Sequence, residues 1–369
     1  MNDIMSVTYT DSLDKVDSFE MTVNNWDAGA KTLDQTAFKY SDKNTFNPWK
    51  DIELQMGYYQ NGMSELRTML IGEITTLTPN FPQSGPPTLT VRGLNLLHRF
   101  RTKQETEPFF KKKDSDIAKY LVGKIATEIR KTSPLLNLKF DQKDYDTNIK
   151  VEKEIPYLLM NNQFPIRFLM ERARDLGYDL SMVEATQGTN RDVTLHYRPG
   201  KDVKRKTYII EWGKSLISFQ PTLQLASQVA ELTVRGWNPQ TKKEIKVTVK
   251  RSQIEGIVTP SELGVNEPEL AKKAEIVIDR PVQNAAEAKL LATNRLKKIN
   301  EALVEAKGKT IGVPDLRAGS KVEIRGVGDR FNGIYLITST THTIGDGGYT
   351  TDFTGKMEEK TGKKEEKKS

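Results

Sequence analysis

The chain has 369 residues, a formal net charge of +7 and no cysteine. This length allows two or three domains, each able to bury a sizeable core. The lack of cysteine excludes disulfides, thiolate zinc sites and cysteine nucleophiles. Residues 1–13 lack the apolar run of a secretory signal, and no stretch approaches the roughly 20 apolar residues of a membrane-spanning helix. We therefore expect neither signal-directed export nor membrane insertion.

Alternating apolar and polar residues predict β-strands in the N-terminal part of the chain. The predicted strands are 16–23, 52–58, 66–77 and 88–93. Asn61-Gly62 is a typical two-residue hairpin turn, and prolines and glycines separate the later strands. This pattern predicts a β-meander, and we expect residues 1–97 to form a first barrel-like β domain.

The middle of the chain has helical periodicity. Apolar residues recur at helical spacing over 114–129 and 163–176, and Gly177 follows the second segment where a helix would end. Short strands are predicted at 180–185, 192–198 and 206–211. Residues 98–214 are therefore expected to form an α+β middle region.

Strand patterns return in the C-terminal part. Strands are predicted within 215–252 and at 320–325, 333–343 and 348–355, with a helix near 283–302. We expect residues 215–356 to form a second barrel-like β domain that includes this helix. Residues 357–369 are mostly Lys and Glu, with no large apolar side chain after Met357, so they are predicted to be a disordered polar tail.

One heptapeptide occurs twice with a single change. Leu89–Asn95 and Leu232–Asn238 differ only at Leu94 and Trp237. A strand used twice indicates a domain used twice, although strand-to-turn sequences also match by coincidence. Together the patterns predict an α+β fold, mainly β, with two related barrel-like β domains and an α+β middle region.

The repeat carries two further expectations. Gly93 and Gly236 are expected to end equivalent strands in a conformation that other residues avoid, so valine should damage folding similarly at either position. Trp212 and Trp237 are expected in a barrel core or at a subunit contact, and the core is favoured.

The sequence contains few of the groups that catalysis or metal binding requires. The three histidines are isolated from one another, and each is expected to be hydrogen-bonded in a turn or a core; they are His98, His196 and His342. Residues 213–215 and 308–310 resemble the end of a phosphate-binding loop but lack its first glycine. No Gly-x-Ser-x-Gly motif is present. We predict no catalytic, cofactor-binding or metal-binding residues, and hence no cofactor and no enzyme.

A basic stretch at 99–113 supports an alternative function. Its cationic residues are Arg99, Arg101, Lys103, Lys111, Lys112 and Lys113. Glu105 and Glu107 interrupt the stretch, whereas a nucleic-acid-binding module needs a concentrated basic face. A solvated loop is therefore favoured, and nucleic acid is not an expected partner.

Several short motifs, in order along the chain, resemble the phage late-control protein D family. The motifs are Tyr9–Ser12, Asn24–Asp27, Glu211–Leu216, Phe219–Leu223, Val234–Pro239, Phe331–Tyr335 and Gly348–Phe353. The resemblance is strongest after Glu211 and weakest over 99–160. The family is similar in fold to the N-terminal hub part of VgrG spike proteins.

This resemblance implies a structural hub in the tail or baseplate of a contractile phage or a related injection system. Members form homotrimers with two barrel-like β domains in each subunit, and the resulting ring matches a six-fold tail tube to a three-fold spike. Since the chain ends soon after Phe353, we expect the spike to be a separate trimeric protein. The expected partners are the chain itself, the tube, the spike and other baseplate proteins, with no membrane.

The expected location is the virion tail or baseplate, or an injection particle, after synthesis in the bacterial cytoplasm. A phage tail, a bacteriocin-like particle and an extracellular injection system all remain open. Two other functions also remain: a nucleic-acid-binding module, and a hub with cell-wall hydrolase activity. A hydrolase would need only two carboxylates at a set separation in space, which a sequence does not reveal.

Overall fold

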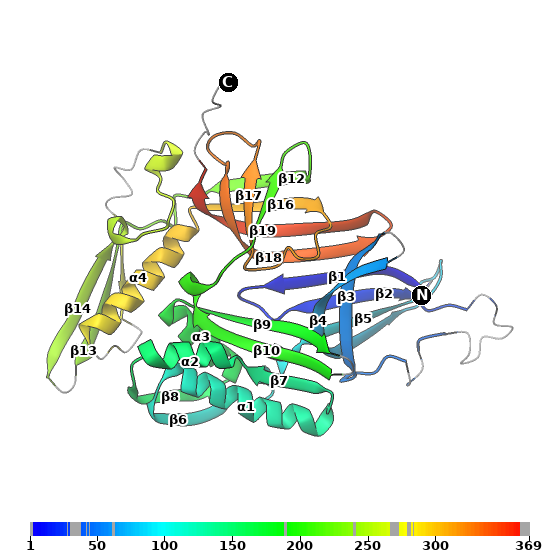
Figure 1. Cartoon of the computed structure of the whole chain (residues 1–369), viewed down its shortest axis with the longest axis horizontal. Helices are drawn as coiled ribbons and strands as arrows, with labels where there is room; N and C mark the ends of the chain where they lie inside the picture. Colours follow the sequence, from blue (N-terminus) through cyan, green and yellow to red (C-terminus); the bar gives the residue numbers. More distant parts are fainter. Residues whose placement is uncertain are drawn as a thin grey trace.

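The computed structural model describes residues 3–27, 29, 38–41, 43, 45–60, 63–187, 190–238, 241–265, 273–278, 282 and 284–361. The fold is α+β and mainly β, as predicted. Figure 1 shows a large sheet formed by both ends of the chain, an α+β middle region, and a smaller unit around α4. No helix among the described residues is long and apolar enough to cross a membrane.

The large sheet has 11 strands and joins the N-terminal and C-terminal parts of the chain. The N-terminal β region consists of β1 (Ile4–Ser12), β2 (Ser18–Asn24), β3 (Asp51–Gln60), β4 (Met63–Asn80) and β5 (Thr88–Asn95). The C-terminal β region consists of β11 (Thr207–Glu211), β12 (Leu216–Leu223), β16 (Val304–Ile311), β17 (Lys321–Arg325), β18 (Gly333–Gly345) and β19 (Gly348–Lys360). The main strand order is β12-β16-β19-β18-β1-β2-β5-β4-β3, and β17 pairs with both β18 and β11.

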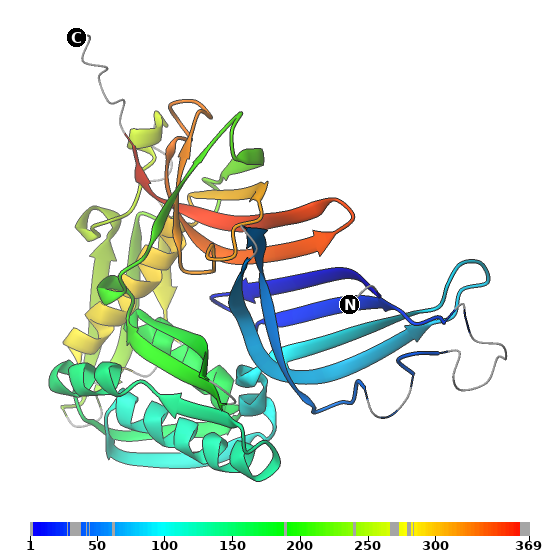
Figure 2. The same ribbon diagram turned by 45° about the vertical axis from the view of Figure 1, so that its right-hand side comes forward.

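Antiparallel pairing of β1 with β18 forms the seam between the two β regions, running from Val7 opposite Ile344 to Ser12 opposite Ser339. Neither region closes into a barrel by strand pairing among the described residues. The β3–β4 hairpin instead curves toward the C-terminal β region (Figure 2), where the Tyr58 hydroxyl donates to the Gly312 carbonyl at 2.7 Å. The two predicted domains are therefore continuous parts of one curled sheet.

The middle region packs helices against small sheets. Its helices are α1 (Asp114–Thr132), α2 (Gln142–Val151) and α3 (Pro165–Leu176); its strands are β6 (Glu105–Lys112), β7 (Leu136–Phe140), β8 (Ile155–Gln163), β9 (Tyr178–Gln187) and β10 (Asn190–Pro199). The sheets are β7-β10-β9 and β6-β8. Gly177 ends α3 at φ 71°, which favours glycine. β11 was expected in this region, but it pairs with β17 in the large sheet.

The segment after β12 forms a separate unit rather than part of a second barrel-like domain. This α4 unit contains β13 (Glu231–Asn238), β14 (Lys243–Lys250), β15 (Ala274–Val277) and α4 (Ala285–Glu301). Its sheet has the order β14-β13-β15, and buried Leu232 and Val234 share a core with Leu291 and Leu296 of α4. The predicted helix near 283–302 is thus present, but its partner is this small sheet.

The two copies of the heptapeptide are both strands, but they are not equivalent. β5 lies between β2 and β4 in the large sheet, antiparallel to both. β13 lies between antiparallel β14 and parallel β15. The prediction that the repeat marks a duplicated domain is therefore wrong. The two tryptophans are also not in a core, since Trp212 is 54% exposed and Trp237 is 60% exposed.

The glycines of the repeat are required by space rather than by backbone conformation. Neither Gly93 nor Gly236 has a positive φ. A Cβ at Gly93 would lie 2.3 Å from Cε1 of Phe19 and 2.5 Å from the Glu73 carbonyl oxygen. A Cβ at Gly236 would lie 2.4 Å from Cγ2 of Val282.

The predicted disordered tail and the predicted Asn61-Gly62 turn fall partly or wholly outside the described residues. Strand β19 continues to Lys360, and Met357 is buried, so the prediction of disorder from residue 357 is wrong for 357–360. Residues 362–369 lie outside the described residues. The predicted Asn61-Gly62 turn also lies outside them, although β3 and β4 pair on either side of it.

Candidate functional site

A partly buried arginine joins the two β regions beside their β1–β18 seam. Arg317 lies in the loop between β16 and β17, where buried Leu316 fixes a turn through its N–H bond to the Val313 carbonyl at 2.9 Å. Nε of Arg317 donates to Oδ2 of Asp11 at 2.7 Å, and Nη2 donates to the Met69 carbonyl at 2.9 Å. One guanidinium therefore fastens the C-terminal β region to β1 and to β4.

Aromatic side chains enclose this arginine. The guanidinium carbon lies 4.6 Å from the ring centroid of Tyr9, and Nη2 also donates to the Tyr9 hydroxyl. Tyr9 is fully buried, and this burial raises the pKa of its hydroxyl. Thr340 of β18 donates to Oδ1 of Asp11, so Asp11 of β1 receives hydrogen bonds from two parts of the C-terminal β region, β18 and the loop before β17.

His342 continues this polar cluster on β18. Its Nε2 lies 3.0 Å from the Leu316 carbonyl, so Nε2 carries the proton, and Nδ1 accepts from the Tyr349 hydroxyl at 2.9 Å. Burial lowers the pKa of His342 to about 4. The imidazole is therefore neutral near physiological pH and orients the loop that carries Arg317.

Two further carboxyl groups lie within electrostatic reach of Arg317. Asp17 accepts from Nδ2 of Asn95 at 2.8 Å, and burial raises its pKa to about 7, with Asp11 adding to the shift. Glu184 of β9 has an enclosed Oε1 without a hydrogen-bond partner, and burial raises its pKa to about 8. We call Arg317, Asp11, Asp17, Glu184 and Tyr9 the seam cluster. It contains three carboxyl groups and one guanidinium, so it retains protons near neutral pH.

A second ion pair fixes the end of the N-terminal β region. Glu73 of β4 is fully buried and accepts from Nε of Arg99 at 2.7 Å and interacts with Nε2 of His98 at 2.6 Å. Burial opposes ionisation, but hydrogen bonds from His98 and Arg99 hold the pKa of Glu73 below its ordinary value. The Arg99 guanidinium also lies 5.0 Å from the Trp49 ring centroid. Arg99 of the predicted basic stretch is thus a structural residue.

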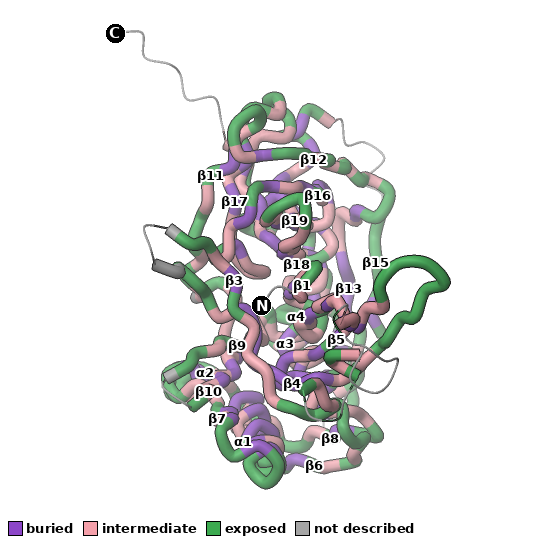
Figure 3. Tube along the Cα trace, turned by 90° about the vertical axis from the view of Figure 1, so that its right-hand side faces the viewer, coloured by how far each residue is buried: buried purple, intermediate pink, exposed green. Residues whose placement is uncertain are grey.

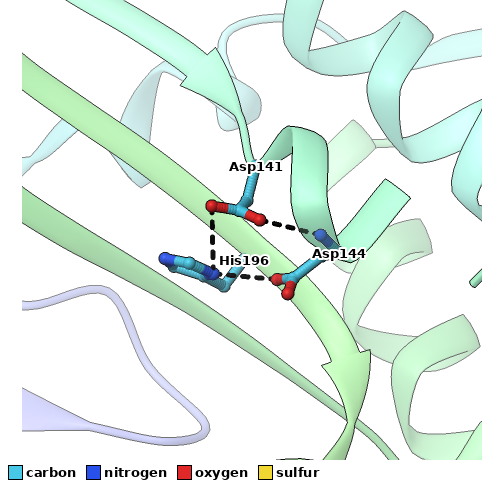
Figure 4. A group of neighbouring side chains, drawn as sticks. All are labelled: Asp141, Asp144 and His196. Carbon is cyan, nitrogen blue, oxygen red and sulfur yellow. Dashed lines mark hydrogen bonds and ion pairs between the residues drawn. The ribbon is translucent and has the colours of Figure 1, made fainter. Parts of the chain in front are cut away.

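The third histidine belongs to a group with two aspartates (Figure 4). Nδ1 of His196 lies 2.8 Å from Asp144 and 3.8 Å from Asp141. Asp141 caps α2 by accepting from the Asp144 N–H at 2.8 Å. Arg198 lies 3.6 Å from the other oxygen of Asp144. These residues satisfy one another and fasten α2 to β10, and a bound metal is not needed to explain them.

The segments that resemble phosphate-binding loops have other roles. Gly308 lies within β16, where a Cβ would lie 2.2 Å from the Phe353 ring. Gly213 has φ 79° in the turn between β11 and β12. Neither glycine begins a helix, so neither segment has the geometry that holds a phosphate.

One large cavity lies between the middle region, α4 and the C-terminal β region. It has a volume of about 1000 Å³ and both acidic and basic lining residues, including Asp14, Arg174 and Lys298. Asp14 lies 3.8 Å from Arg174 and 3.5 Å from Lys298. The cavity therefore carries no net charge preference that would indicate a ligand class.

Sequence reasoning found none of the seam cluster. Arg317 and Asp11 are 306 residues apart in the chain, Arg317 lies in no motif that was singled out, and no motif pointed to a buried charge at Asp11. The only sequence signal near them was the resemblance of Tyr9–Ser12 to the opening of the late-control protein D family. The three histidines were singled out, and each has hydrogen-bond partners in the structure.

Comparisons with known proteins identify the fold. The protein-family model for the Alg8 N-terminal domain matches residues 186–346. This range begins in β9 and ends between β18 and β19, so it crosses all three parts of the molecule. No curated protein sequence matches the chain.

Solved structures match almost the whole chain. The 43 kDa tail protein of prophage MuSo2 from Shewanella oneidensis matches with a TM-score of 0.63 and 12% identity, over 95% of this chain and 93% of that one. The tail protein from Neisseria meningitidis MC58 gives a TM-score of 0.62 and 10% identity, over 96% and 92%. The E. coli c3393 protein, a component of the type VI secretion system, gives 0.55 and 12%, over 96% and 73%. The chain therefore has the fold of phage tail proteins and of their type VI secretion relatives.

Proposed function

We propose that the chain is a structural hub of a phage tail baseplate or related injection particle. The observation that carries this proposal is the match to the prophage tail proteins over nearly the full length of both chains. The E. coli protein is described as similar to bacteriophage T4 tail proteins, which is consistent with the same role. The expected partners are a tail tube protein, a separate spike protein and other baseplate proteins.

In this proposal the hub is a homotrimer that adapts a six-fold tube to a three-fold spike. Three copies with two β regions each present six β regions around a three-fold axis, and closed cyclic assembly is the common way to build such a ring. Within each copy, the β1–β18 seam sets the angle between neighbouring regions. Arg317 and Asp11 support a fixed angle because their ion pair links the two regions beside this seam, and its Asp11 carboxylate is buried.

A structural role without catalysis is part of the proposal. Arg317 and Asp11 of the seam cluster are held in hydrogen bonds that link the loop before β17 to β1 and β4. Charged groups that are bonded to one another in this way fix the relative position of strands, and they are not free to act on a substrate. Incubation of the purified chain with peptidoglycan tests this point, and release of soluble fragments would support the hydrolase alternative.

The trimer is tested by measuring the mass of the native assembly with light scattering and native mass spectrometry. We expect a mass of three chains, alone or after addition of the tube and spike proteins of the same particle. A chain that stays monomeric at high concentration with both partners present would contradict the proposal. Electron microscopy of the assembled sample should then show a ring with six lobes.

A further inference from the structure

Strands β6 and β8 form an antiparallel pair whose apolar outward face is not covered by the described part of the chain. Its inward side chains Phe109 and Met160 are buried in the core of the middle region. On the opposite face, Phe110 is 62% exposed, Tyr157 is 49% exposed and Leu159 is 38% exposed. Large apolar side chains grouped in this way are typical of a contact surface rather than of ordinary solvent-facing strands.

Strand register gathers these side chains into one stripe. Phe110 lies opposite Tyr157, and Pro108 lies opposite Leu159. The rings of Phe110 and Tyr157 are 5.3 Å apart between centroids and inclined at 53°. Two large rings held by backbone pairing form a rigid platform, and such a platform loses little side-chain entropy on binding.

Lysines surround one end of this stripe. Lys111 and Lys112 follow Phe110 directly, and Lys150 and Lys153 are exposed just before β8. The Lys113 ammonium group bonds to the Ile149 carbonyl, which brings these two segments together. Within the described part of the chain, the four exposed lysines form no ion pair, whereas Lys124 nearby pairs with Glu105 at 2.5 Å. Their charge is therefore available to a partner.

We infer that the outward face of the β6–β8 strand pair binds an acidic segment of another protein chain, with an apolar side chain of that segment resting on Phe110 and Tyr157. The free lysines supply the charge complementarity, and the exposed rings supply the central apolar contact. This inference rests on the proposed function only in naming another component of the particle as the natural source of the segment.

The same face suits nucleic acid less well. A strand of nucleic acid needs a positive track along several nucleotides, but the outward positions of β6 on the far side of Phe110 are Pro108 and Thr106, which carry no charge. Leu159 and Pro108 offer contact area without a flat ring for base stacking. The exposed lysines beside the paired rings lie at one end of the β6–β8 strand pair, which fits a short acidic segment.

The β6–β8 strand pair lies far from the C-terminal β region. Figure 3 shows β6 and β8 at the lower end of the molecule and β12 at the upper end. A partner at this face would therefore not compete with contacts made by the C-terminal β region.

The test is a fluorescence anisotropy titration of the full-length chain. The probe is a fluorescein-labelled dodecapeptide of alternating Glu and Asp around a central Trp-Leu pair. We expect saturable binding that weakens at least about tenfold for Phe110→Ser and for the double change Lys111→Glu, Lys112→Glu. The matched control Lys131→Glu, on the exposed end of α1, should bind as the unchanged chain does. Thermal melts of each variant confirm that these exposed substitutions leave the fold intact.

Two additional probes complete the test. A peptide with Ser-Gly in place of Trp-Leu should bind at least about tenfold more weakly. An oligothymidylate of the same length should bind more weakly than the acidic peptide. Absence of peptide binding, equal binding by all variants, or tighter binding of the oligothymidylate with a steep salt dependence would overturn the inference. The assembly mass is measured separately, so a monomer that binds the peptide refutes only the trimer, and a trimer that does not bind it refutes only this surface.

Discussion

Strands β5 and β13 have nearly the same sequence but lie in different structural surroundings. β5 is a central strand of the large sheet, whose two β regions are joined by buried charges around Arg317. β13 belongs to the α4 unit, whose core is an apolar contact between a sheet and a helix. The difference shows that a local pattern determines a strand and its buried face, whereas the partners of that face come from distant parts of the chain.

The contribution of the Arg317–Asp11 ion pair to the stability of the large sheet is tested by Arg317→Met. The change leaves Asp11 buried without its cation, so we expect a loss of about 3–5 kcal/mol in the free energy of unfolding. Urea titration measures the loss. Arg67→Met is the control, because Arg67 pairs with Asp315 at 3.3 Å on the surface and should cost less than about 1 kcal/mol.

A double variant separates the ion pair from simple packing. If the unpaired charge causes the loss, Arg317→Met combined with Asp11→Leu should be more stable than Arg317→Met alone. A loss of less than about 1 kcal/mol for Arg317→Met would show that the charged seam does not hold the β regions together.

The different surroundings of the two heptapeptide copies are tested by replacing Gly93 and Gly236 with valine. Gly93→Val would press against the carbonyl of Glu73, which belongs to a central strand and cannot move freely, so we expect a loss of about 3 kcal/mol. Gly236→Val would press against the side chain of Val282, and a loss of about 1–2 kcal/mol is expected. Thermal unfolding of both variants measures the difference.

The smaller effect at Gly236 has its own control. Val282→Ala removes the atom that a new side chain would meet, so Gly236→Ala should be tolerated better in that background than in the unchanged chain. Equal damage by valine at both positions would contradict the expectation that a clash with a backbone carbonyl costs more than a clash with a side chain.

The enclosed carboxyl groups of the seam cluster make the stability of the chain depend on pH. The pKa of Glu184 is raised from 4.5 to about 8, so the folded chain keeps a proton that the unfolded chain loses. Stability should therefore fall as the pH rises from about 5 to about 8. Glu184→Gln should reduce this fall by about 2 kcal/mol, a figure that discounts the full shift for the partial exposure of the side chain.

This prediction is measured by urea titration at a series of pH values. Glu154→Gln, an exposed change on the same region, is the control and should leave the pH profile unchanged. Asp17 also has a raised pKa, about 7, so the two carboxyl groups titrate as a coupled pair and some of the fall should remain. An identical profile for Glu184→Gln and the unchanged chain would exclude Glu184 from the effect.

Much of the secondary structure could be predicted because periodicity is local. Helices α1, α3 and α4 have clear apolar stripes, and most strands of the β regions alternate. Helix α2 was missed because its sequence is largely polar and its stability comes from the Asp141 cap and from buried Asn148, which bonds to the Tyr197 carbonyl at 2.6 Å. Strand β16 was missed because Gly308 and several lysines interrupt its pattern.

The seam cluster could not be predicted for a different reason. Its residues come from β1, β9 and the loop before β17, and the sheet order that brings them together joins the two ends of the chain. A buried charge has no sequence signature when its partner is hundreds of residues away. The resemblance to tail proteins indicated the overall fold, but it gave no information on which charges lie inside it.

The smallest expected effect concerns the arginine that both copies of the heptapeptide share. Arg92 of β5 pairs with Glu20 at 2.6 Å, and Arg235 of β13 lies 4.0 Å from Glu244. Both pairs are largely exposed, so methionine at either position should change the free energy of unfolding by less than about 1 kcal/mol, with the larger loss at Arg92. Urea titration in low and high salt measures both losses. Because salt screens exposed charges, the difference between the two losses should disappear in high salt. A loss at Arg235 comparable to that of Arg317→Met would mean that the stability of the α4 unit also depends on charge. Strands β5 and β13 would then differ only in how their side chains pack.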